Sequence, residues 1–458
     1  MADGAPHSTE APPKKTLIIT HDHCALHMTR KTAPERPARL QYVMGSLKQL
    51  KLEDPACAGR MEIQEIQTSS SMLSALSESC CDFARMPRRL PMLSRTASVG
   101  YLEEKIVPAV KAVHTQAYLQ RLASSCVELL DEAARNPKGA RRQQVAKAQE
   151  KNLKELDSDT VVSASSLSAA LCAALSCCHA VDACCDPYLP YANAFAVIRP
   201  PGHHAGTNGP TVGHDRFAAV SEERAAKAKA ASAAFAFASQ PVGPCDGTAD
   251  CSQGFCLLNN AAIAARHALL CHAASIRRVA IVDIDLHHGN GTEEIVRGWT
   301  DVMYVSLHGV GDHTNGQWFY PDTGTVLQVD ERLVNVPLPR GTTSDAYLQA
   351  FDTHASPALR RFAPDLIIIS CGFDACAGDS PAHPEGYLQL TPRAYADVTR
   401  RLRDLADECC QGRLVSLFEG GYRQRPLHAC ARAHVCALLG YDYDAMLASA
   451  QARLEAER

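Results

Sequence analysis

Short apolar runs rich in Val, Ile and Leu recur along the chain, separated by long stretches rich in Ala, Leu and Arg. Continuous apolar runs of this length are typical of strands that are buried on both faces of a sheet. They predict strands over Leu17–Thr20, Ala194–Arg199, Val279–Asp285, Met303–Leu307, Leu366–Ser370 and Leu414–Phe418. Because these strands alternate with helical stretches, we expect an α/β fold with a mostly parallel sheet and helices on both faces.

Four of the predicted strands are followed at once by polar turns that contain glycine. In a parallel α/β sheet the carboxyl ends of the strands share one rim, and ligands bind there. We therefore expect four distant segments to meet: Pro200–His204, Asp285–Gly291, Cys371–Asp374 and Glu419–Tyr422.

Asp283, Asp285 and His287 alternate along the end of one predicted strand. Residues two apart on a strand project to the same face, so two carboxylates and an imidazole are aligned. Buried carboxylates repel each other unless a cation or a proton neutralises them, which favours a metal site. Asp374, after another strand, is a candidate third ligand beside Asp285 and His287. Two Asp and one His leave a coordination position open, as catalytic Zn(II) requires, and also suit Fe(II), Co(II) or Mn(II).

His203 and His204 lie on a proline-rich turn and offer an imidazole base for water at the metal. Tyr422 offers a phenol that stabilises an oxyanion. Metal, base and phenol together are the parts needed for metal-assisted hydrolysis of an amide. The Gly289–Gly291 turn also suggests a phosphate loop, but it lacks the spacing and the Lys-Ser/Thr that such loops require.

These motifs resemble the zinc-dependent histone deacetylase family, and more specifically its class II branch. The resemblance extends over residues 17–439 and rests on ordered matches at Arg199–Ala205, Gly254–Asn260, Val282–Thr292, Tyr304–His308, Phe319–Gly324, Cys371–Asp379 and Glu419–Tyr422. It implies a single arginase-like and deacetylase-like α/β domain around a central, mostly parallel eight-stranded sheet.

The resemblance also implies a role for each residue of the catalytic centre. It assigns Zn(II), one ion per chain, to the ligands Asp285, His287 and Asp374. It implies that His204 is the general base and that Asp283 holds the neighbouring His203, as groups behind a metal site commonly do. Tyr422 corresponds to the tyrosine that polarises the acetyl carbonyl, which one inactive-leaning branch of the family replaces by His.

Four further positions match residues that bind the substrate. Phe255 and Tyr320 correspond to two aromatics that enclose the aliphatic part of acetyl-lysine, and Gly254 to a tunnel carbonyl. Asp159 matches a rim carboxylate that grips the substrate backbone. The resemblance also implies a structural monovalent-cation site, for K⁺, at Asp283, Ser306 and Leu307 with main-chain oxygens of Asp285 and His287.

Some positions depart from the family pattern. Ala33 stands where His usually precedes Pro-Glu, and Asp322 replaces a Gly. Pro381 stands where a Leu normally lines the tunnel mouth, which leaves the substrate preference open. A Glu at this mouth would favour a cationic polyamine, and Glu385 lies four residues away.

The charge balance restricts the partners of the chain. The 46 Lys and Arg nearly match the 50 Asp and Glu, so we expect no global field that recruits nucleic acid or anionic membrane, and no direct sequence-specific DNA binding. We also find no run of about 18 apolar residues, so a membrane span is not expected.

Residues 135–154 carry seven basic residues against one acidic residue. They suit a solvated face or, alternatively, contact with nucleic acid or an acidic partner.

The chain contains 20 cysteines. Its polar, Pro- and Ala-rich beginning does not resemble a signal peptide, so we expect a reducing compartment and free thiols that act as small buried hydrophobes. A zinc cluster is a disfavoured alternative, because no CxxC spacing accompanies its candidate ligands, Cys177, Cys178, His179, Cys184 and Cys185.

We therefore expect a protein lysine deacetylase that acts on histone tails in transcriptional repression. Two alternatives stay open: a deacetylase of acetylpolyamines or of non-histone proteins such as tubulin, and a corepressor scaffold that retains the fold and recruits corepressor partners. The nucleus is the expected location, with the cytoplasm left open.

The length of 458 residues alone would suggest about three domains. Since the motifs that must meet extend from His203 to Tyr422, we instead expect one large catalytic domain over residues 16–445. Polar helices and loops are expected over residues 53–95, with insertions at about 135–154 and 206–252. Residues 1–15 are expected to be a disordered tail and residues 446–458 a helical one.

Overall fold

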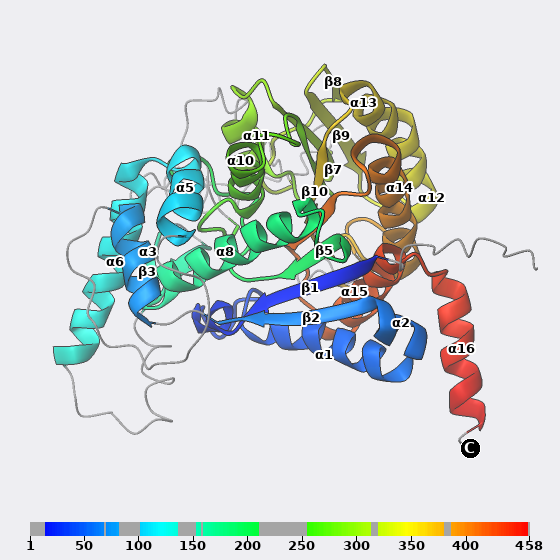
Figure 1. The fold of residues 1–458 in the computed structure, drawn as a ribbon, viewed down its shortest axis with the longest axis horizontal. Helices are drawn as coiled ribbons and strands as arrows, with labels where there is room; N and C mark the ends of the chain where they lie inside the picture. Colours follow the sequence, from blue (N-terminus) through cyan, green and yellow to red (C-terminus); the bar gives the residue numbers. More distant parts are fainter. Residues whose placement is uncertain are drawn as a thin grey trace, which may run out of the picture.

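The computed structural model describes residues 14–67, 70–81, 101–135, 153–156, 159–209, 254–312, 319–379 and 386–456. These residues form one large sheet, shown in Figure 1. In spatial order its strands are β2 (Met61–Ile66), β1 (Lys15–His21), β5 (Tyr191–Val197), β11 (Leu414–Phe418), β10 (Leu366–Cys371), β6 (Val279–Asp283), β7 (Val302–Val310), β9 (Leu333–Pro339) and β8 (Gln328–Val329). All neighbours are parallel except β8 and β9. The mostly parallel α/β fold is confirmed, but the expected eight strands are nine, because the two-residue β8 adds an antiparallel edge.

All six runs predicted as strands form strands of this sheet, and the three strands that the apolar runs missed lie at or next to its edges. In β2, polar Glu62, Gln64 and Glu65 are interspersed with apolar residues, and the strand is largely half-exposed or exposed. An edge strand of this kind needs no continuous apolar run. The expectation that residues 53–95 form only helices and loops was therefore wrong.

The helices cover both faces of the sheet (Figure 1). The helices that form these two layers are α1 (Ala38–Glu53), α8 (Ser166–Cys185), α10 (Asn260–Cys271), α11 (Asn290–Val296), α14 (Pro392–Cys410) and α15 (Gln424–Leu439). Right-handed connections between parallel strands place α8, α10 and α11 on one face and α1 and α14 on the other, where α15 packs against both. The strand ends are thus held between two helical layers.

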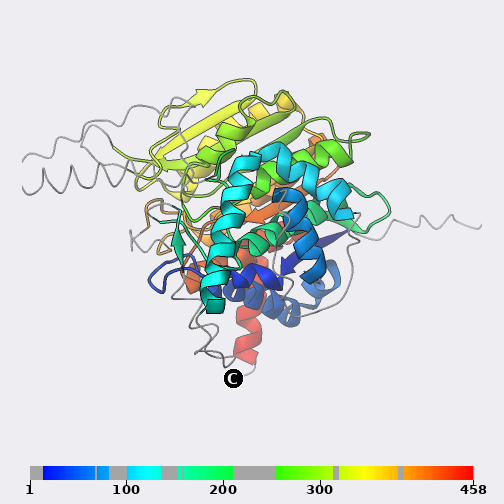
Figure 2. The ribbon, with the colours of Figure 1, turned by 90° about the vertical axis from the view of Figure 1, so that its left-hand side faces the viewer.

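Further helices pack outside these layers or extend from them. Figure 2 looks onto α3, α5 and α6, which pack over α8 and α10. The remaining elements are α2 (Pro55–Arg60), α3 (Ser70–Cys81), α5 (Val107–Val113), α6 (Gln116–Arg135), α12 (Ser344–Ala350), α13 (Ser356–Phe362), α16 (Tyr443–Ala456), a 3₁₀ turn (Asp22–Leu26), two π-helical turns (Leu102–Ile106, Phe351–Ala355) and a small hairpin of β3 (Lys154–Glu155) and β4 (Val161–Val162).

The central helix α8 is built from Ala, Leu, Ser and Cys and is buried almost throughout. By length and composition it is the one helix among the described residues that could cross a membrane, but 89% of its apolar window is buried inside the protein, as in a core helix. The 18 cysteines within the described residues are all free, and only Cys185, Cys271 and Cys409 are not fully buried. Free, buried thiols are therefore confirmed for this part of the chain.

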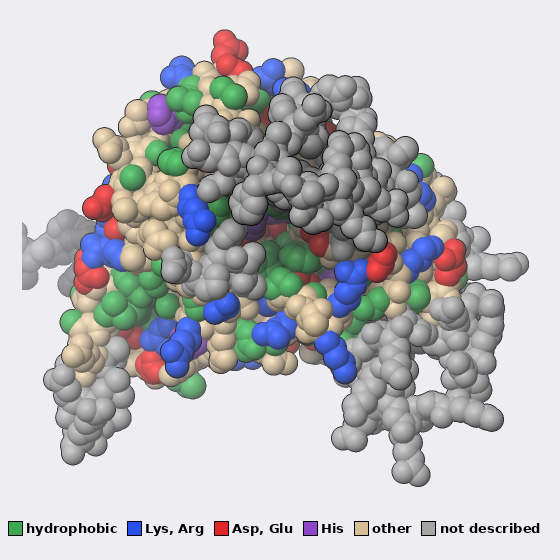
Figure 3. Space-filling view, turned by 180° about the vertical axis from the view of Figure 1, so that it is seen from behind, with side chains coloured by type: hydrophobic (Ala, Val, Ile, Leu, Met, Phe, Trp, Pro, Cys, Tyr) green, Lys and Arg blue, Asp and Glu red, His purple; other side chains and the backbone are tan. Residues whose placement is uncertain are grey.

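Residues 1–13 and most of the two expected insertions lie outside the described residues. At the other end, helix α16 begins at Tyr443, just before the range expected for the helical tail. Figure 3 shows Lys and Arg interspersed with Asp and Glu over the described part of one face.

Candidate active site

Four adjacent strands carry the expected metal ligands, the two histidines and Tyr422 at their carboxyl ends, and the neighbouring β7 carries Ser306 and Leu307. In the order β5, β11, β10, β6 and β7, these strands lie side by side in the middle of the sheet. The register places Asp283 of β6 opposite Ser370 of β10 and Ser306 of β7, so the strand ends are level. The polar segments predicted to meet at one rim therefore do meet.

The structure brings Asp285, His287 and Asp374 together as a group that could hold a metal ion. His287 Nδ1 lies 3.2 Å from Asp285 Oδ1 and 3.0 Å from Asp374 Oδ2. Both carboxylates are buried, whereas 21% of the His287 side chain is exposed, so the group has one open side. Such a set of three ligands with an open position suits catalytic Zn(II).

The surroundings of this group also fit a cation. Asp374 Oδ2 is buried, and its near neighbour is the His287 ring at 3.0 Å, with no well-aligned hydrogen-bond donor among the described residues, as expected for an oxygen that shares a metal with that ring. Gly420 leaves the necessary space, because a Cβ there would lie 2.4 Å from Asp374 Oδ2 and 2.5 Å from Asp285 Oδ2. A side chain at position 420 would therefore displace both carboxylates.

The pKa values of the three potential ligands are shifted in different directions. Burial opposes ionisation of Asp285, but His203 and His287 hold its pKa well below the usual range. Burial raises the pKa of Asp374, and the Asp285 carboxylate raises it further. Burial also opposes protonation of His287, but the two carboxylates outweigh this and raise its pKa to about 9. The two carboxylates therefore stabilise a positive charge on the group that lies between them.

The two histidines at the end of β5 lie in different environments. His203 Nδ1 lies 3.0 Å from Asp283 Oδ2, which also accepts a hydrogen bond from the Tyr304 hydroxyl. Burial opposes protonation of His203, but Asp285 and Asp283 raise its pKa well above the ordinary value. Burial and the neighbouring His203 lower the pKa of His204 well below it. His204 is therefore the neutral imidazole of the pair.

Asn290 is a site residue that the motif analysis missed. Its Oδ1 lies 2.7 Å from His204 Nδ1, so the ring donates from Nδ1 and keeps the lone pair on Nε2. Asn290 lies in the Gly289–Gly291 turn, whose glycine spacing by itself indicates a loop and not a histidine partner. Its role is to orient an imidazole.

Tyr422 is half-buried, and the main chain around it is held by hydrogen bonds. The Asp379 carboxylate accepts hydrogen bonds from the backbone N–H groups of Tyr422 and Arg423. The Arg39 guanidinium lies 4.9 Å from the centre of the Tyr422 ring and donates to the carbonyls of Gly421 and Glu419. Burial and Asp374 keep the pKa of the Tyr422 phenol high, so it stays a hydrogen-bond donor.

A buried group of ion pairs packs against the turn that carries Tyr422. Glu35 pairs with Arg39 at 3.1 Å and with Arg199 at 2.5 and 2.7 Å. Burial opposes ionisation of Glu35, but Arg199 and Arg39 lower its pKa to about 2. Glu419 accepts from the backbone N–H groups of Gly202 and His203, which links the turns after β11 and β5. Of these four side chains, Arg39 alone lay outside the segments compared with the family, and the contacts of all four were not foreseen.

Aromatic residues gather around the open side of the metal group. The Phe255 ring lies 6.1 Å from that of Tyr422, and the Tyr320 ring lies 5.1 Å from His204 and 5.8 Å from His287. Phe319, not foreseen from sequence as a site residue, stacks on His287 at 5.4 Å. This arrangement is consistent with an apolar passage to the metal.

Gly254 and Asp159 lie together at this passage. Asp159 Oδ1 accepts a hydrogen bond from the Gly254 N–H at 3.0 Å. Gly254 has a φ of +73°, and a Cβ there would lie 2.3 Å from His204 Cδ2. Only glycine fits both the backbone and the space.

The residues expected to form the monovalent-cation site are adjacent. Asp283 and Ser306 are register partners on β6 and β7, and both are buried, as is Leu307. Ser306 Oγ lies 2.8 Å from His308 Nδ1.

Of the departures from the family pattern, Asp322 has a φ of +65°, the left-handed conformation that glycine adopts most easily. Pro381 and Glu385 lie outside the described residues.

The disfavoured cysteine cluster does not form: the described residues contain two groups of three potential metal ligands, and neither includes a cysteine. One is Asp285, His287 and Asp374. The other is Asp182, His267 and His272.

The histone deacetylase domain family matches this chain over residues 94–221 and 217–438. The chain belongs to the histone deacetylase family. It is 35% identical to the type-2 histone deacetylase 2 of Dictyostelium discoideum over 292 residues, which are 61% of this chain and 14% of that relative. It is 38% identical to histone deacetylase 15 of Arabidopsis thaliana over 254 residues, 54% of this chain and 36% of the relative. It is 36% identical to the histone deacetylase clr3 of Schizosaccharomyces pombe over 280 residues, 59% of this chain and 33% of the relative.

A solved histone deacetylase structure has the same fold. The crystal structure of the HDA15 HD domain is 27% identical to this chain, with a TM-score of 0.61, and the match covers 96% of this chain and 94% of the other. The region matched in the curated relatives is between 14% and 36% of their length, so they extend well beyond it. The recognised family and its α/β fold are confirmed.

Proposed function

We propose that the chain is a zinc-dependent lysine deacetylase that hydrolyses acetyl-lysine to lysine and acetate. The observation that carries this proposal is the convergence of Asp285, His287 and Asp374 with His204 and Tyr422 on one open-sided site. A Zn(II) ion held by the three ligands would polarise the acetyl carbonyl and lower the pKa of the attacking water. The protein residues then supply proton transfer, charge stabilisation and positioning.

His204 is the general base in this proposal. Its hydrogen bond to Asn290 leaves Nε2 free to take a proton from water and later to give it to Nζ of the departing lysine. Tyr422 donates a hydrogen bond to the oxygen that becomes negative during attack. His203, paired with Asp283, adds positive charge beside the site.

Substrate binding is assigned to the aromatic passage. Phe255 and Tyr320 would enclose the aliphatic part of acetyl-lysine, which carries no charge, and the Gly254 carbonyl would lie alongside it. Asp159 at the entrance would accept hydrogen bonds from the substrate backbone. A structural K⁺ at Asp283, Ser306 and Leu307 would stabilise the ends of β6 and β7.

An acetyl-lysine peptide assay on zinc-loaded protein tests this proposal. We expect Tyr422→Phe to lower kcat by about 100-fold or more, because it removes the donor to the oxyanion. Tyr188→Phe is the matched control, since Tyr188 is 93% exposed, and it should retain full activity. Equal turnover by wild type and Tyr422→Phe would refute the mechanism.

Histone tails are the proposed substrates, in line with the names of the related histone deacetylases. Comparing kcat/KM for an acetylated histone peptide, an acetylated tubulin peptide and an acetylpolyamine separates the substrate classes. A preference for the histone peptide supports a role on histone tails in transcriptional repression, and co-purification of corepressor proteins with the tagged chain tests for the proposed partners. A preference for the polyamine contradicts it.

We propose the nucleus as the location, with the cytoplasm as the alternative. Two relatives, from Oryza sativa and Arabidopsis thaliana, have names that include "chloroplastic", so imaging of the tagged protein is the direct test. A signal confined to plastids would contradict the proposal.

A further inference from the structure

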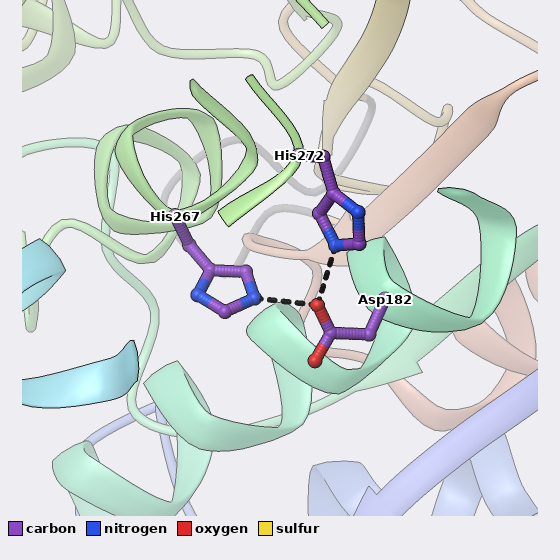
Figure 4. Close-up of side chains that lie close together, drawn as sticks. All are labelled: Asp182, His267 and His272. Carbon is purple, nitrogen blue, oxygen red and sulfur yellow. Dashed lines mark hydrogen bonds and ion pairs between the residues drawn. The ribbon is translucent and has the colours of Figure 1, made fainter. Parts of the chain in front are cut away.

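A second group of potential metal ligands lies between helices α8 and α10. It consists of Asp182 near the end of α8, His267 near the end of α10, and His272 just after α10 (Figure 4). Each helix leads into a parallel strand, so both end near the amino ends of the strands. The group therefore lies at the end of the sheet opposite the catalytic rim.

The two imidazoles converge on a single carboxylate oxygen. His267 Nε2 and His272 Nε2 each lie 2.7 Å from Asp182 Oδ1 (Figure 4). In the catalytic group the corresponding separations are 3.0 and 3.2 Å. In both groups the potential ligand atoms lie within 4.8 Å of one another. The second group is thus as compact as the first.

The outer atoms of the group are held by the protein. His267 Nδ1 lies 3.3 Å from the Lys105 carbonyl oxygen, which directs the lone pair on Nε2 inward. The Tyr101 hydroxyl donates to Asp182 Oδ2 at 2.5 Å, which leaves Oδ1 for the histidines. Support of this kind orients ligands behind metal sites.

The donor chemistry favours a transition metal. Two imidazole nitrogens and a carboxylate oxygen suit Zn(II), whereas Mg²⁺ and Ca²⁺ prefer oxygen ligands. Asp182 lines a surface cavity of about 460 Å³, which gives an ion access from solvent.

We propose that Asp182, His267 and His272 bind a second divalent transition-metal ion of the Zn(II) class, separate from the catalytic one. The ion would link the end of α8 to the end of α10 and replace the direct hydrogen bonds between these side chains. Its role is structural, because the topology places it at the far end of the sheet from the catalytic residues.

Zinc content per chain tests the proposal on the full chain. The protein is stripped with a chelator, dialysed against Zn(II), freed of excess metal and measured by elemental mass spectrometry. We expect two zinc ions in the wild type, one in His272→Gln, one in Asp285→Asn and none in the double variant. His354→Gln, a partly exposed histidine on another helical segment, is the control and should retain two. Circular dichroism checks that each variant is folded.

Cobalt and activity measurements separate this site from the catalytic one. Co(II) bound to Asp285→Asn should give the visible absorption of a tetrahedral site, and His272→Gln should abolish it in that background. Deacetylase activity of His272→Gln should stay within about twofold of wild type, since His272 is remote from the catalytic residues. One zinc ion in the wild type, lost in Asp285→Asn but retained in His272→Gln, would overturn the proposal and leave a hydrogen-bonded ion-pair cluster. Two ions in both wild type and His272→Gln would overturn it as well.

Discussion

The orientation of a single imidazole depends on one amide. Asn290 Oδ1 accepts from His204 Nδ1, and burial together with His203 lowers the pKa of His204. A base with a low pKa stays unprotonated as the pH falls, so the proposed deacetylase activity should persist into mildly acidic solution. The charge at position 290 should therefore control the acidic limb of the pH profile.

Replacing Asn290 by Asp tests this dependence. A carboxylate at hydrogen-bond distance favours the protonated imidazole and should raise the pKa of His204 by about one to three units. Because only neutral His204 acts as a base, the acidic limb of kcat/KM should move to higher pH by the same amount. Asn208→Asp, whose side chain contacts Thr115, is the control and should leave the limb in place. An unmoved limb in Asn290→Asp would contradict the role of His204 as base.

Some residues of the site could be identified from local sequence and others could not. Asp285, His287 and Asp374 follow predicted strands, so strand position and residue type were sufficient to nominate them. Arg39 could not be nominated in this way, because its contact with Gly421 joins residues 382 positions apart. Its function depends on which turns the fold brings together, and no local pattern contains that information.

At the level of elements, Glu35 connects three parts of the fold. It precedes α1, pairs with Arg39 of α1 and pairs with Arg199 just after β5. Its folded pKa of about 2 lies below the ordinary 4.5. The contribution of ionised Glu35 to the free energy of unfolding is therefore fully present above about pH 4.5 and is lost as the pH falls toward 2.

Glu35→Gln should remove this pH-dependent stability. The lowered pKa of Glu35 corresponds to about 3 kcal/mol of stability, and leaving two buried arginines without this carboxylate costs about 3–5 kcal/mol at neutral pH. Urea unfolding should show a large deficit at pH 7 that shrinks as the pH falls below 4.5. Glu408→Gln, which breaks an exposed pair with Arg360, should cost less than about 1 kcal/mol. A Glu35→Gln deficit that is constant with pH would contradict the assignment.

The position of each strand in the sheet explains which strands could be predicted from the sequence. Central strands such as β10 are buried on both faces, so their apolar runs were clear. Strand β9 contains two prolines and lies beside the edge strand β8, and neither strand has the continuous run of a central strand. An edge strand has a neighbouring strand on one side only. Which strands lie at the edge depends on the tertiary fold and not on the local sequence.

At the level of the whole molecule, the catalytic site requires most of the chain to fold as one unit. Its metal ligands, histidines and Tyr422 come from the ends of β5, β11, β10 and β6 and are supported by Glu35 and Arg39 from the amino-terminal part. The second ligand group links α8 and α10 at the other end of the same sheet. Metal binding at either end should therefore be reported by the stability of the entire chain, since a ligand that binds only the folded state stabilises it by mass action.

Asp374→Asn gives a prediction at this level. In metal-free protein the variant should be more stable than wild type, because Asp374 is buried beside Asp285 and the two carboxylates repel. With free zinc at 100 times its Kd, binding at the catalytic site adds about 2.7 kcal/mol to the wild type only, so the order should reverse. Urea unfolding with chelator and with zinc measures both orders. Asp352→Asn, at an exposed pair with Arg401, should differ from wild type equally in both conditions. If Asp374→Asn differs from wild type by the same amount with and without zinc, Asp374 is not a ligand.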